Sequence, residues 1–188
     1  MADYIEYLEQ FLGETAYGWS KDAGGSDLPF QIVKYNGGPF PGTVSYTTLG
    51  LSNIPLQSPV SDKKIRHELV FVADSQFGDR NIPGILQQVA NQAIQRNTAY
   101  VRGNVIGPYG VLFEGSELEA LYVSIPVYFP DVFHVFDDAE NGPIVQVWLL
   151  PITRREVLFV QENGWDAFED VLERINPDLV DFARGSVV

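Results

Sequence analysis

The chain has 188 residues, 45% of them hydrophobic and 13% aromatic, a composition typical of one folded globular domain. It contains no cysteine, and this excludes disulfides and thiolate metal sites. The formal net charge of -13 disfavours direct nucleic-acid binding, because phosphate backbones are polyanions, and favours a basic protein partner. The start of the chain is acidic where a secretory signal is basic, and no apolar run approaches the roughly 18 residues of a membrane span. We therefore expect a cytoplasmic protein without membrane contact.

The acidic residues are unevenly distributed along the chain. Residues 113–188 contain 15 acidic and 4 basic residues, whereas residues 63–112 contain 3 acidic and 6 basic ones. A surface field of this sign speeds the approach of a basic partner and penalises acidic ones. The alternative, which composition alone leaves open, is that the acidic surface serves only solubility.

Apolar residues that recur at helical spacing indicate helices at the beginning, in the middle and at the end of the chain. The first covers residues 4–12 and ends at Gly13, and the second begins near Pro83 and ends near Asn97. Strand or extended character occurs over residues 30–35, 41–52, 63–73, 102–107, 118–127, 129–136 and 144–152. Loops are predicted for residues 13–26, 36–39, 52–61, 74–81 and 137–143.

Residues 144–175 combine several local signals that agree with one another. The first nine are almost entirely apolar and predict a central strand buried on both faces, with pairing that fades at Pro151. Thr153 and Glu156 fit a capping box at the start of a helix that ends at Gly164, and a second helix follows directly. We interpret this unit as scaffold without chemistry of its own.

Strands joined mainly by turns, with helices at the start, middle and end, favour an α+β fold. We predict a mixed, largely antiparallel β-sheet with helices packed over it. Strict alternation of strand and helix is absent, which disfavours a doubly wound parallel sheet. Gly50, inside a strand-like run, predicts a bulge or a close approach of the backbone.

Signals of catalysis are few. The sequence lacks the G-x-S-x-G nucleophile motif, the phosphate loop and the dinucleotide-binding glycine pattern. His67 and His134 could meet in space with Asp137 or Asp138 to form a metal or acid–base site, and the two aspartates could act as paired carboxylates. The simpler interpretations are a strand histidine with a satisfied ring nitrogen and a solvated acidic turn. A binding protein is favoured over an enzyme, with no metal or cofactor, and a hydrolase built on these groups is the alternative.

Several stretches occur in an order and spacing that characterise one protein family. They are residues 43–52, 66–69, 97–98 with 103–106, 151–153 with Glu156, the helical residues Gly164, Trp165, Phe168 and Leu172, and the tail residues Asp181, Arg184 and Ser186. Together they resemble the suppressor-of-fused domain family, in its small bacterial form, over residues 40–187. The tail departs from the usual Asp-Pro pattern of that family, because Phe182 follows Asp181.

The resemblance implies a single α+β domain over residues 1–188, without established catalytic residues and without a cofactor. In animals the related domain sequesters a transcription factor, and bacterial proteins of this type are usually predicted immunity proteins, or antitoxins, of toxin systems. The resemblance is strongest to antitoxins of nuclease-type toxins. It implies that the chain binds and neutralises a basic cognate toxin by protein–protein contact. A regulatory scaffold for an endogenous protein is the alternative.

A nuclease presents Lys and Arg to phosphates, so a loop that offers carboxylates in their place can fill its substrate groove. The candidate partner-binding residues are Glu114, Glu117, Glu119, Asp131, Asp137, Asp138 and Glu140. They lie on or beside the ends of predicted strands, where rigid elements hold loops in position. For each of them the alternative is a solvated turn. The oligomeric state stays open, a dimer through an edge strand included.

Overall fold

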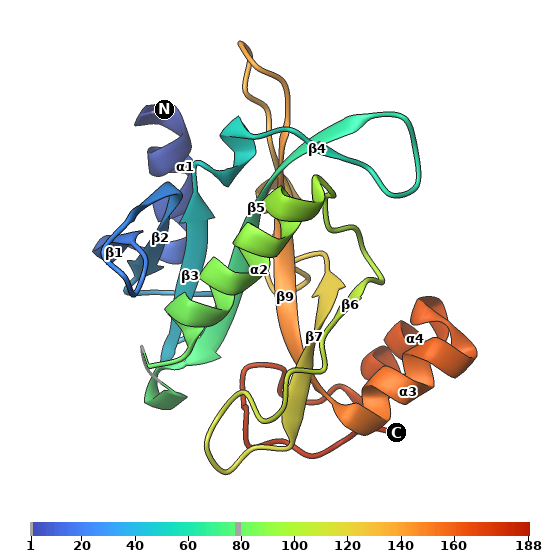
Figure 1. Cartoon of the computed structure of the whole chain (residues 1–188). Coiled ribbons are helices and arrows are strands. Elements are labelled where there is room, and N and C mark those ends of the chain that lie inside the picture. The colour runs from blue at the N-terminus through green and yellow to red at the C-terminus, as the bar shows by residue number, and fades with distance from the viewer. Residues whose placement is uncertain (1, 78–79) are drawn as a thin grey trace.

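The protein is described by a computed structural model over residues 2–77 and 80–188, and its centre is a mixed β-sheet (Figure 1). The hydrogen-bonded order is β1-β2-β3-β5-β9-β7-β6, while β4 pairs with β5 and β8 with β9. β5 and β9 are parallel, and the other paired strands are antiparallel. The strands are Thr15–Lys21 (β1), Asp27–Tyr35 (β2), Thr43–Leu49 (β3), Leu56–Gln57 (β4), Lys64–Asp74 (β5), Val105–Ile106 (β6), Leu118–Ser124 (β7), Val135–Phe136 (β8) and Ile144–Thr153 (β9). The predicted fold class is confirmed.

Helices cover both faces of this sheet (Figure 1). They are Ala2–Leu12 (α1), Ile82–Arg96 (α2), Arg154–Asn163 (α3) and Trp165–Ile175 (α4), with short 3-10 turns at Leu51–Asn53 (η1), Ser75–Phe77 (η2) and Asp131–Phe133 (η3). α2 packs on Leu69 and Phe71 of β5, whereas α1 packs on Val70 and Val72. Because successive strand residues point to opposite faces, α1 and α2 lie on opposite sides of the sheet. Within the described part of the chain, no helix has the length and apolarity to cross a membrane.

The C-terminal unit forms largely as predicted. β9 lies between β5 and β7, and its residues are buried almost throughout. The Thr153 hydroxyl accepts from the amide of Glu156 and the Glu156 carboxylate accepts from the amide of Thr153, which completes the capping box. The prediction that pairing fades at Pro151 is wrong on one side: β5 pairs only as far as Trp148, but β7 continues to Thr153. The missing amide of the proline faces away from β7's ladder, so it interrupts nothing there.

Other segments differ from the prediction. Residues 13–26 contain β1 instead of a loop, because the strand forms by pairing with β2 while its own side chains stay mostly exposed and give no apolar signal. The strand expected over residues 129–136 is interrupted by the turn η3, which begins after Pro130, and only the two residues of β8 pair. Part of the loop predicted over residues 74–81 lies outside the described residues.

The side chains of β5 alternate between the two faces of the sheet. Arg66 and Glu68 point to the α1 face together with Val70, whereas His67 points to the α2 face with Leu69. Adjacent residues of one strand therefore serve two separate environments.

Candidate functional site

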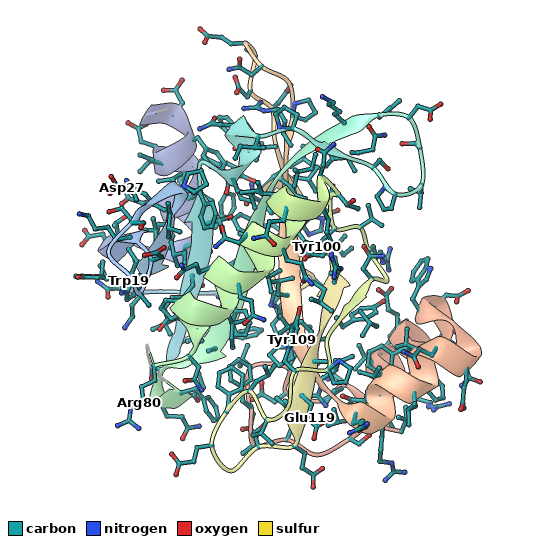
Figure 2. The ribbon with its side chains drawn as sticks, viewed as in Figure 1. Trp19, Asp27, Arg80, Tyr100, Tyr109 and Glu119 are labelled. Carbon is teal, nitrogen blue, oxygen red and sulfur yellow. The ribbon has the colours of Figure 1, made fainter. Side chains whose placement is uncertain are left out.

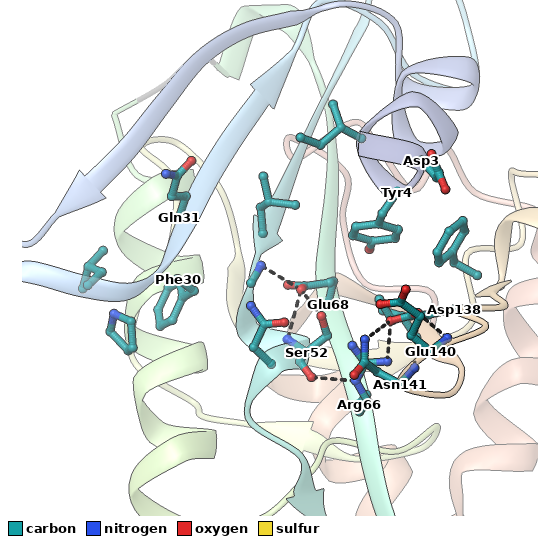
Figure 3. A pocket seen from close by; sticks show the side chains of 18 of the residues that line it. Asp3, Tyr4, Phe30, Gln31, Ser52, Arg66, Glu68, Asp138, Glu140 and Asn141 are labelled. Atoms are coloured by element: carbon teal, nitrogen blue, oxygen red, sulfur yellow. Dashed lines mark hydrogen bonds and ion pairs between the residues drawn. The ribbon is translucent and has the colours of Figure 1, made fainter. Parts of the chain in front are cut away.

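A cleft of about 850 Å³ opens on the α1 face of the sheet (Figure 3). Its walls come from the start of α1, from β1 and β2, from η1, and from the turn that joins β8 to β9. Four of the acidic residues that line it are exposed, and they come from three different parts of the chain: Asp3, Asp27, Asp137 and Glu140. Of the lining residues that the structure describes, Arg66 is the one base. The cleft thus presents an excess of negative charge.

Glu68 lies at the floor of the cleft with no exposed surface. One carboxylate oxygen accepts from the amides of Gly50 and Ser52, at 2.9 and 3.0 Å, and from the Ser52 hydroxyl at 2.7 Å. The other accepts from the Thr48 hydroxyl at 2.6 Å. Gly50 can turn its amide inward because it adopts a positive φ of 99°. Its position predicted a bulge or a close backbone approach, but a Cβ there would meet its nearest neighbours at 3.5 and 3.8 Å, so the glycine serves the left-handed conformation instead.

The charge of Glu68 is balanced by dipoles and not by a cation, because none of the described residues forms an ion pair with it. Burial raises the pKa of Glu68, and the hydrogen bonds from Thr48, Ser52 and Gly50 oppose that rise. The carboxylate is saturated by these donors, so its role is to hold the η1 segment against β5.

Arg66, two residues earlier on the same face, joins two separate segments. Its Nε donates to the carbonyl of Ser52 at 3.0 Å. Its Nη1 donates to a carboxylate oxygen of Asp138 at 3.0 Å (Figure 3). The same nitrogen donates to the carbonyl of Gly142 at 2.5 Å. Both members of the ion pair are largely shielded, with side-chain exposures of 13% and 20%.

Asp138 organises the acidic turn from within. It accepts from the backbone amides of Glu140 and Asn141 and from the side-chain amide of Asn141, at 3.1 to 3.3 Å. The Asn141 side chain, followed by the Arg66 guanidinium and these backbone amides, lowers the pKa of Asp138 to about 2. Asp138 is therefore committed to the turn, whereas Asp137 and Glu140 are exposed and available to a partner.

The seven predicted residues do not form one surface. Asp137, Asp138 and Glu140 meet at the cleft, but Glu117 and Glu119 line a smaller hollow of about 330 Å³ together with Arg154 and Arg155. These hollows lie beside opposite ends of β9, whose ten residues span about 30 Å at about 3.3 Å each. In Figure 2, Asp27, which lines the cleft, and Glu119 lie at different ends of the molecule. Glu114 and Asp131 are exposed and line neither hollow.

Sequence reasoning missed four charged residues of the cleft: Asp3, Asp27, Arg66 and Glu68. Asp3 and Asp27 carry no linear signal, because only the tertiary fold brings α1 and β2 beside the turn. Glu68 did carry one, since an acidic residue directly before the apolar run of a central strand must be paired or hydrogen-bonded once buried.

The histidines do not form a shared site with the aspartates. The Nε2 atom of His67 accepts from the amide of Tyr100 at 3.1 Å, and burial lowers the pKa of His67 to about 4. This is the strand histidine with a satisfied ring nitrogen. His134 follows η3, and its backbone carbonyl accepts from Gln146. Across the described residues, no group of three or more His, Asp and Glu is placed to hold a metal ion.

A second buried carboxylate belongs to the C-terminal unit. Glu156 has no exposed surface, and Arg184 from the tail donates to both of its oxygens at 2.7 and 3.2 Å. Arg184 also donates to the carbonyl of Pro151, and Glu156 accepts from the amide of Val187. Glu156 is thus a helix cap and the anchor of the tail, which the capping signal alone did not predict.

Comparison with known sequences identifies the family of this chain. The sequence pattern of the family described as suppressor of fused protein (SUFU) matches residues 26–185. The chain belongs to the suppressor of fused family. It is also similar to immunity protein YqcF of Bacillus subtilis (strain 168), with 26% identity over 162 residues that cover 84% of this chain and 81% of that protein.

Solved structures of the SUFU family share the fold. A putative SUFU homolog from Neisseria gonorrhoeae FA 1090 matches with a TM-score of 0.74 and 20% identity, over 100% of this chain and 98% of that one. The Sufu–Fu complex matches with a TM-score of 0.72 and 16% identity, over 99% and 91% of the two chains. Drosophila Suppressor of Fused matches with a TM-score of 0.69 and 15% identity, over 98% of this chain but 50% of that chain. At these identities the likeness concerns the fold.

The stretches that resemble the SUFU family converge on the two buried carboxylates. Residues 43–52 and 66–69 supply Glu68 and its donors, and residues 151–153 with Arg184 surround Glu156. A third contact joins Gly103 to Trp165, because a Cβ at position 103 would lie 2.5 Å from the Trp165 ring. The family pattern in this chain therefore marks packing and positioning.

Proposed function

We propose that the chain is an immunity protein that binds a cognate bacterial toxin in the cytoplasm and neutralises it by protein–protein contact. The observation that carries this proposal is the acidic cleft, whose one described base is already engaged by Asp138. The similarity to an immunity protein supports the same role. The contact acts by occupation of a surface and requires no catalytic group.

The charge of the cleft suits a toxin that acts on nucleic acid. A nuclease exposes Lys and Arg where phosphates bind, and carboxylates held on a rigid frame can occupy those positions. Asp137 and Glu140 project from a turn held at both ends, and Asp3 and Asp27 lie across the cleft. We assign partner contact to these four residues first, and to Glu114, Glu117, Glu119 and Asp131 only as distant contributors to the field.

The test uses the intact chain as bait in a lysate of its own cells, at low and at high salt. We expect recovery of one basic toxin domain that high salt releases, because steering by opposite charges is screened by ions. The purified toxin should lose its nuclease activity when the bait is added in equal amount. Recovery of an endogenous regulator in place of a toxin would support the scaffold function instead.

A matched pair of variants locates the contact. D137N/E140Q removes two exposed charges at the cleft, and E114Q/E117Q removes two exposed charges that do not line it. Both variants change the net charge equally. We expect the first to weaken toxin binding at least about tenfold and the second about twofold or less. Equal weakening would mean that only the overall charge matters and that the cleft is not the contact.

A further inference from the structure

The acidic turn owes its shape to a residue outside it. Residues 137–143 connect β8 to β9, and they contain no apolar side chain that would pack the turn onto the core except Ala139 and Pro143, both exposed. Its internal hydrogen bonds all run to Asp138: the amides of Glu140 and Asn141 donate to the side chain and that of Gly142 donates to the backbone carbonyl. What holds Asp138 therefore holds the turn.

Arg66 is the group that holds Asp138. Its guanidinium contacts the turn at two points, the Asp138 carboxylate and the Gly142 carbonyl, which are the first and last residues of the hydrogen-bonded loop. The planar guanidinium carries donors on separate nitrogens in fixed directions, so Nε bonds the carbonyl of Ser52 while Nη1 bonds both acceptors of the turn. A lysine ammonium has all its donors on one nitrogen and could not reach both sides in this way. Since Arg66 lies opposite Ile144 in the β5–β9 register, it reaches the turn from the neighbouring strand.

Arg66 is itself fixed from the other side. The carbonyl of Ser52 accepts from its Nε, and both the amide and the hydroxyl of Ser52 are bound to Glu68 (Figure 3). A continuous series of hydrogen bonds thus runs from the buried floor of the cleft, through η1, to the exposed turn. Each link joins groups that are buried or largely shielded from water, where hydrogen bonds between charged groups are strongest.

We propose that Arg66 is a positioning residue that fixes the turn 137–142 in the form the partner recognises, while Asp137 and Glu140 make the contacts. This inference rests on the proposed function, because it concerns how the same cleft is presented to a partner. It separates two kinds of residue within the cleft. Arg66 and Asp138 maintain the geometry, and their exposed neighbours supply the charge.

Substitution of Arg66 changes the net charge in a direction that distinguishes a positioning role from a purely electrostatic one. Replacing Arg66 by Gln makes the chain more acidic by one unit, so electrostatics alone would strengthen the binding of a basic partner. Loss of position would weaken it. The double variant R66Q/D138N keeps the net charge of -13 and removes the ion pair, so electrostatics alone predicts no change for this variant.

The first experiment uses the free chain and needs no partner. Amide hydrogen exchange, followed by NMR, is measured for Glu140, Asn141 and Gly142 in the wild type, R66Q, R66K and R66Q/D138N. We expect exchange at these amides to rise about tenfold in R66Q and in the double variant, and less in R66K, while amides of β9 change less than about twofold. Unchanged exchange at the turn would overturn the inference whatever the partner is.

The second experiment measures binding of these variants to the toxin domain recovered by the intact chain. Weaker binding of R66Q and R66Q/D138N, by about tenfold, would support the positioning role against the electrostatic expectation. Binding that is unchanged or tighter, with the turn loosened, would overturn it. If the wild type itself recovers no toxin, the proposed function fails, and the exchange measurement still decides whether Arg66 holds the turn.

Discussion

Two carboxylates, Glu68 and Glu156, are buried without any exposed surface, and they are neutralised in different ways. Glu156 has a cation, Arg184, which donates to both of its oxygens. Glu68 accepts from two hydroxyls and two amides, and none of the described cations pairs with it. Glu156 is balanced by an ion pair within the protein. Glu68 has no described cation paired with it and lies at the floor of an open cleft.

This difference separates a closed structural site from one that lines the open cleft. A buried ion pair costs desolvation on both sides, and it is strongly destabilising to remove only one partner. Glu156 and Arg184 therefore tie the tail to α3 and are not accessible to a partner protein. Glu68 instead organises the segment that carries Ser52, and through Arg66 the exposed acidic turn. We therefore expect the same substitution, Glu to Gln, to change the free energy of unfolding by different amounts at positions 68 and 156.

The largest effect is expected for E156Q. It leaves the guanidinium of Arg184, which is 9% exposed, buried without a counter-charge. We expect the free energy of unfolding to fall by about 3–5 kcal/mol, measured by urea denaturation. E162Q, an exposed position on the same helix, is the matched control and should change it by less than about 0.5 kcal/mol. A loss below about 1 kcal/mol for E156Q would show that the ion pair is not the anchor of the tail.

The second-largest effect is a change of stability with pH, to which His67 and its neighbour Glu68 contribute with opposite signs. Burial lowers the pKa of His67 to about 4 from an ordinary value of 6.5, so the unfolded chain binds more protons between these values. The stability that neutral His67 provides is complete above about pH 6.5 and is lost as the pH falls towards 4. The raised pKa of Glu68 acts oppositely, since the folded chain binds this proton more tightly and gains stability as the pH falls from the raised pKa to the ordinary value of 4.5.

The variant H67Q removes the titration of the histidine and leaves Glu68 in place. Its side-chain oxygen can still accept from the amide of Tyr100, but it does not titrate. Between pH 7 and 4 we expect the wild type to lose about 2–3 kcal/mol relative to H67Q, measured by urea denaturation at each pH. Parallel pH profiles for the two proteins would contradict a neutral, buried His67.

E68Q is expected to cost only about 1 kcal/mol at pH 7. The amide oxygen of Gln can keep the three bonds from Gly50 and Ser52, so only the bond from Thr48 is lost. Removal of a buried charge that no described cation balances also offsets part of that loss. E68A leaves these donors unpaired and should cost more, about 3 kcal/mol. If E68Q costs as much as E156Q in urea denaturation, the two carboxylates do not differ in the way that their partners indicate.

Local signals predicted the scaffold better than the cleft. The C-terminal unit was predictable because the apolar run, Thr153, Glu156 and Gly164 act within a few residues of one another. β1 was missed because its pairing with β2 is its main support, and its exposed side chains show no pattern. Long-range partners such as Arg184 for Glu156, separated by 28 residues, cannot be assigned from spacing alone.

The predicted acidic residues show the same limit of local reasoning. Seven acids near strand ends were predicted as one group, but strand ends can lie at either edge of a sheet. The register places three of them at the cleft and the others elsewhere. Arg66 could not be recognised either, because its role depends on Asp138, which is 72 residues away.

The smallest effect on stability is expected for D137N/E140Q, although its effect on binding is expected to be large. Both side chains are exposed, and no described cation forms an ion pair with them. Their removal relieves some repulsion in a chain of net charge -13, so we expect the free energy of unfolding to change by less than about 0.5 kcal/mol. Urea denaturation and toxin binding, measured on the same preparation, test the expected small change in stability and the expected large loss of binding. A loss of binding that accompanied a loss of stability above about 1 kcal/mol would mean that these carboxylates belong to the frame, as Glu156 does, and not to the contact surface.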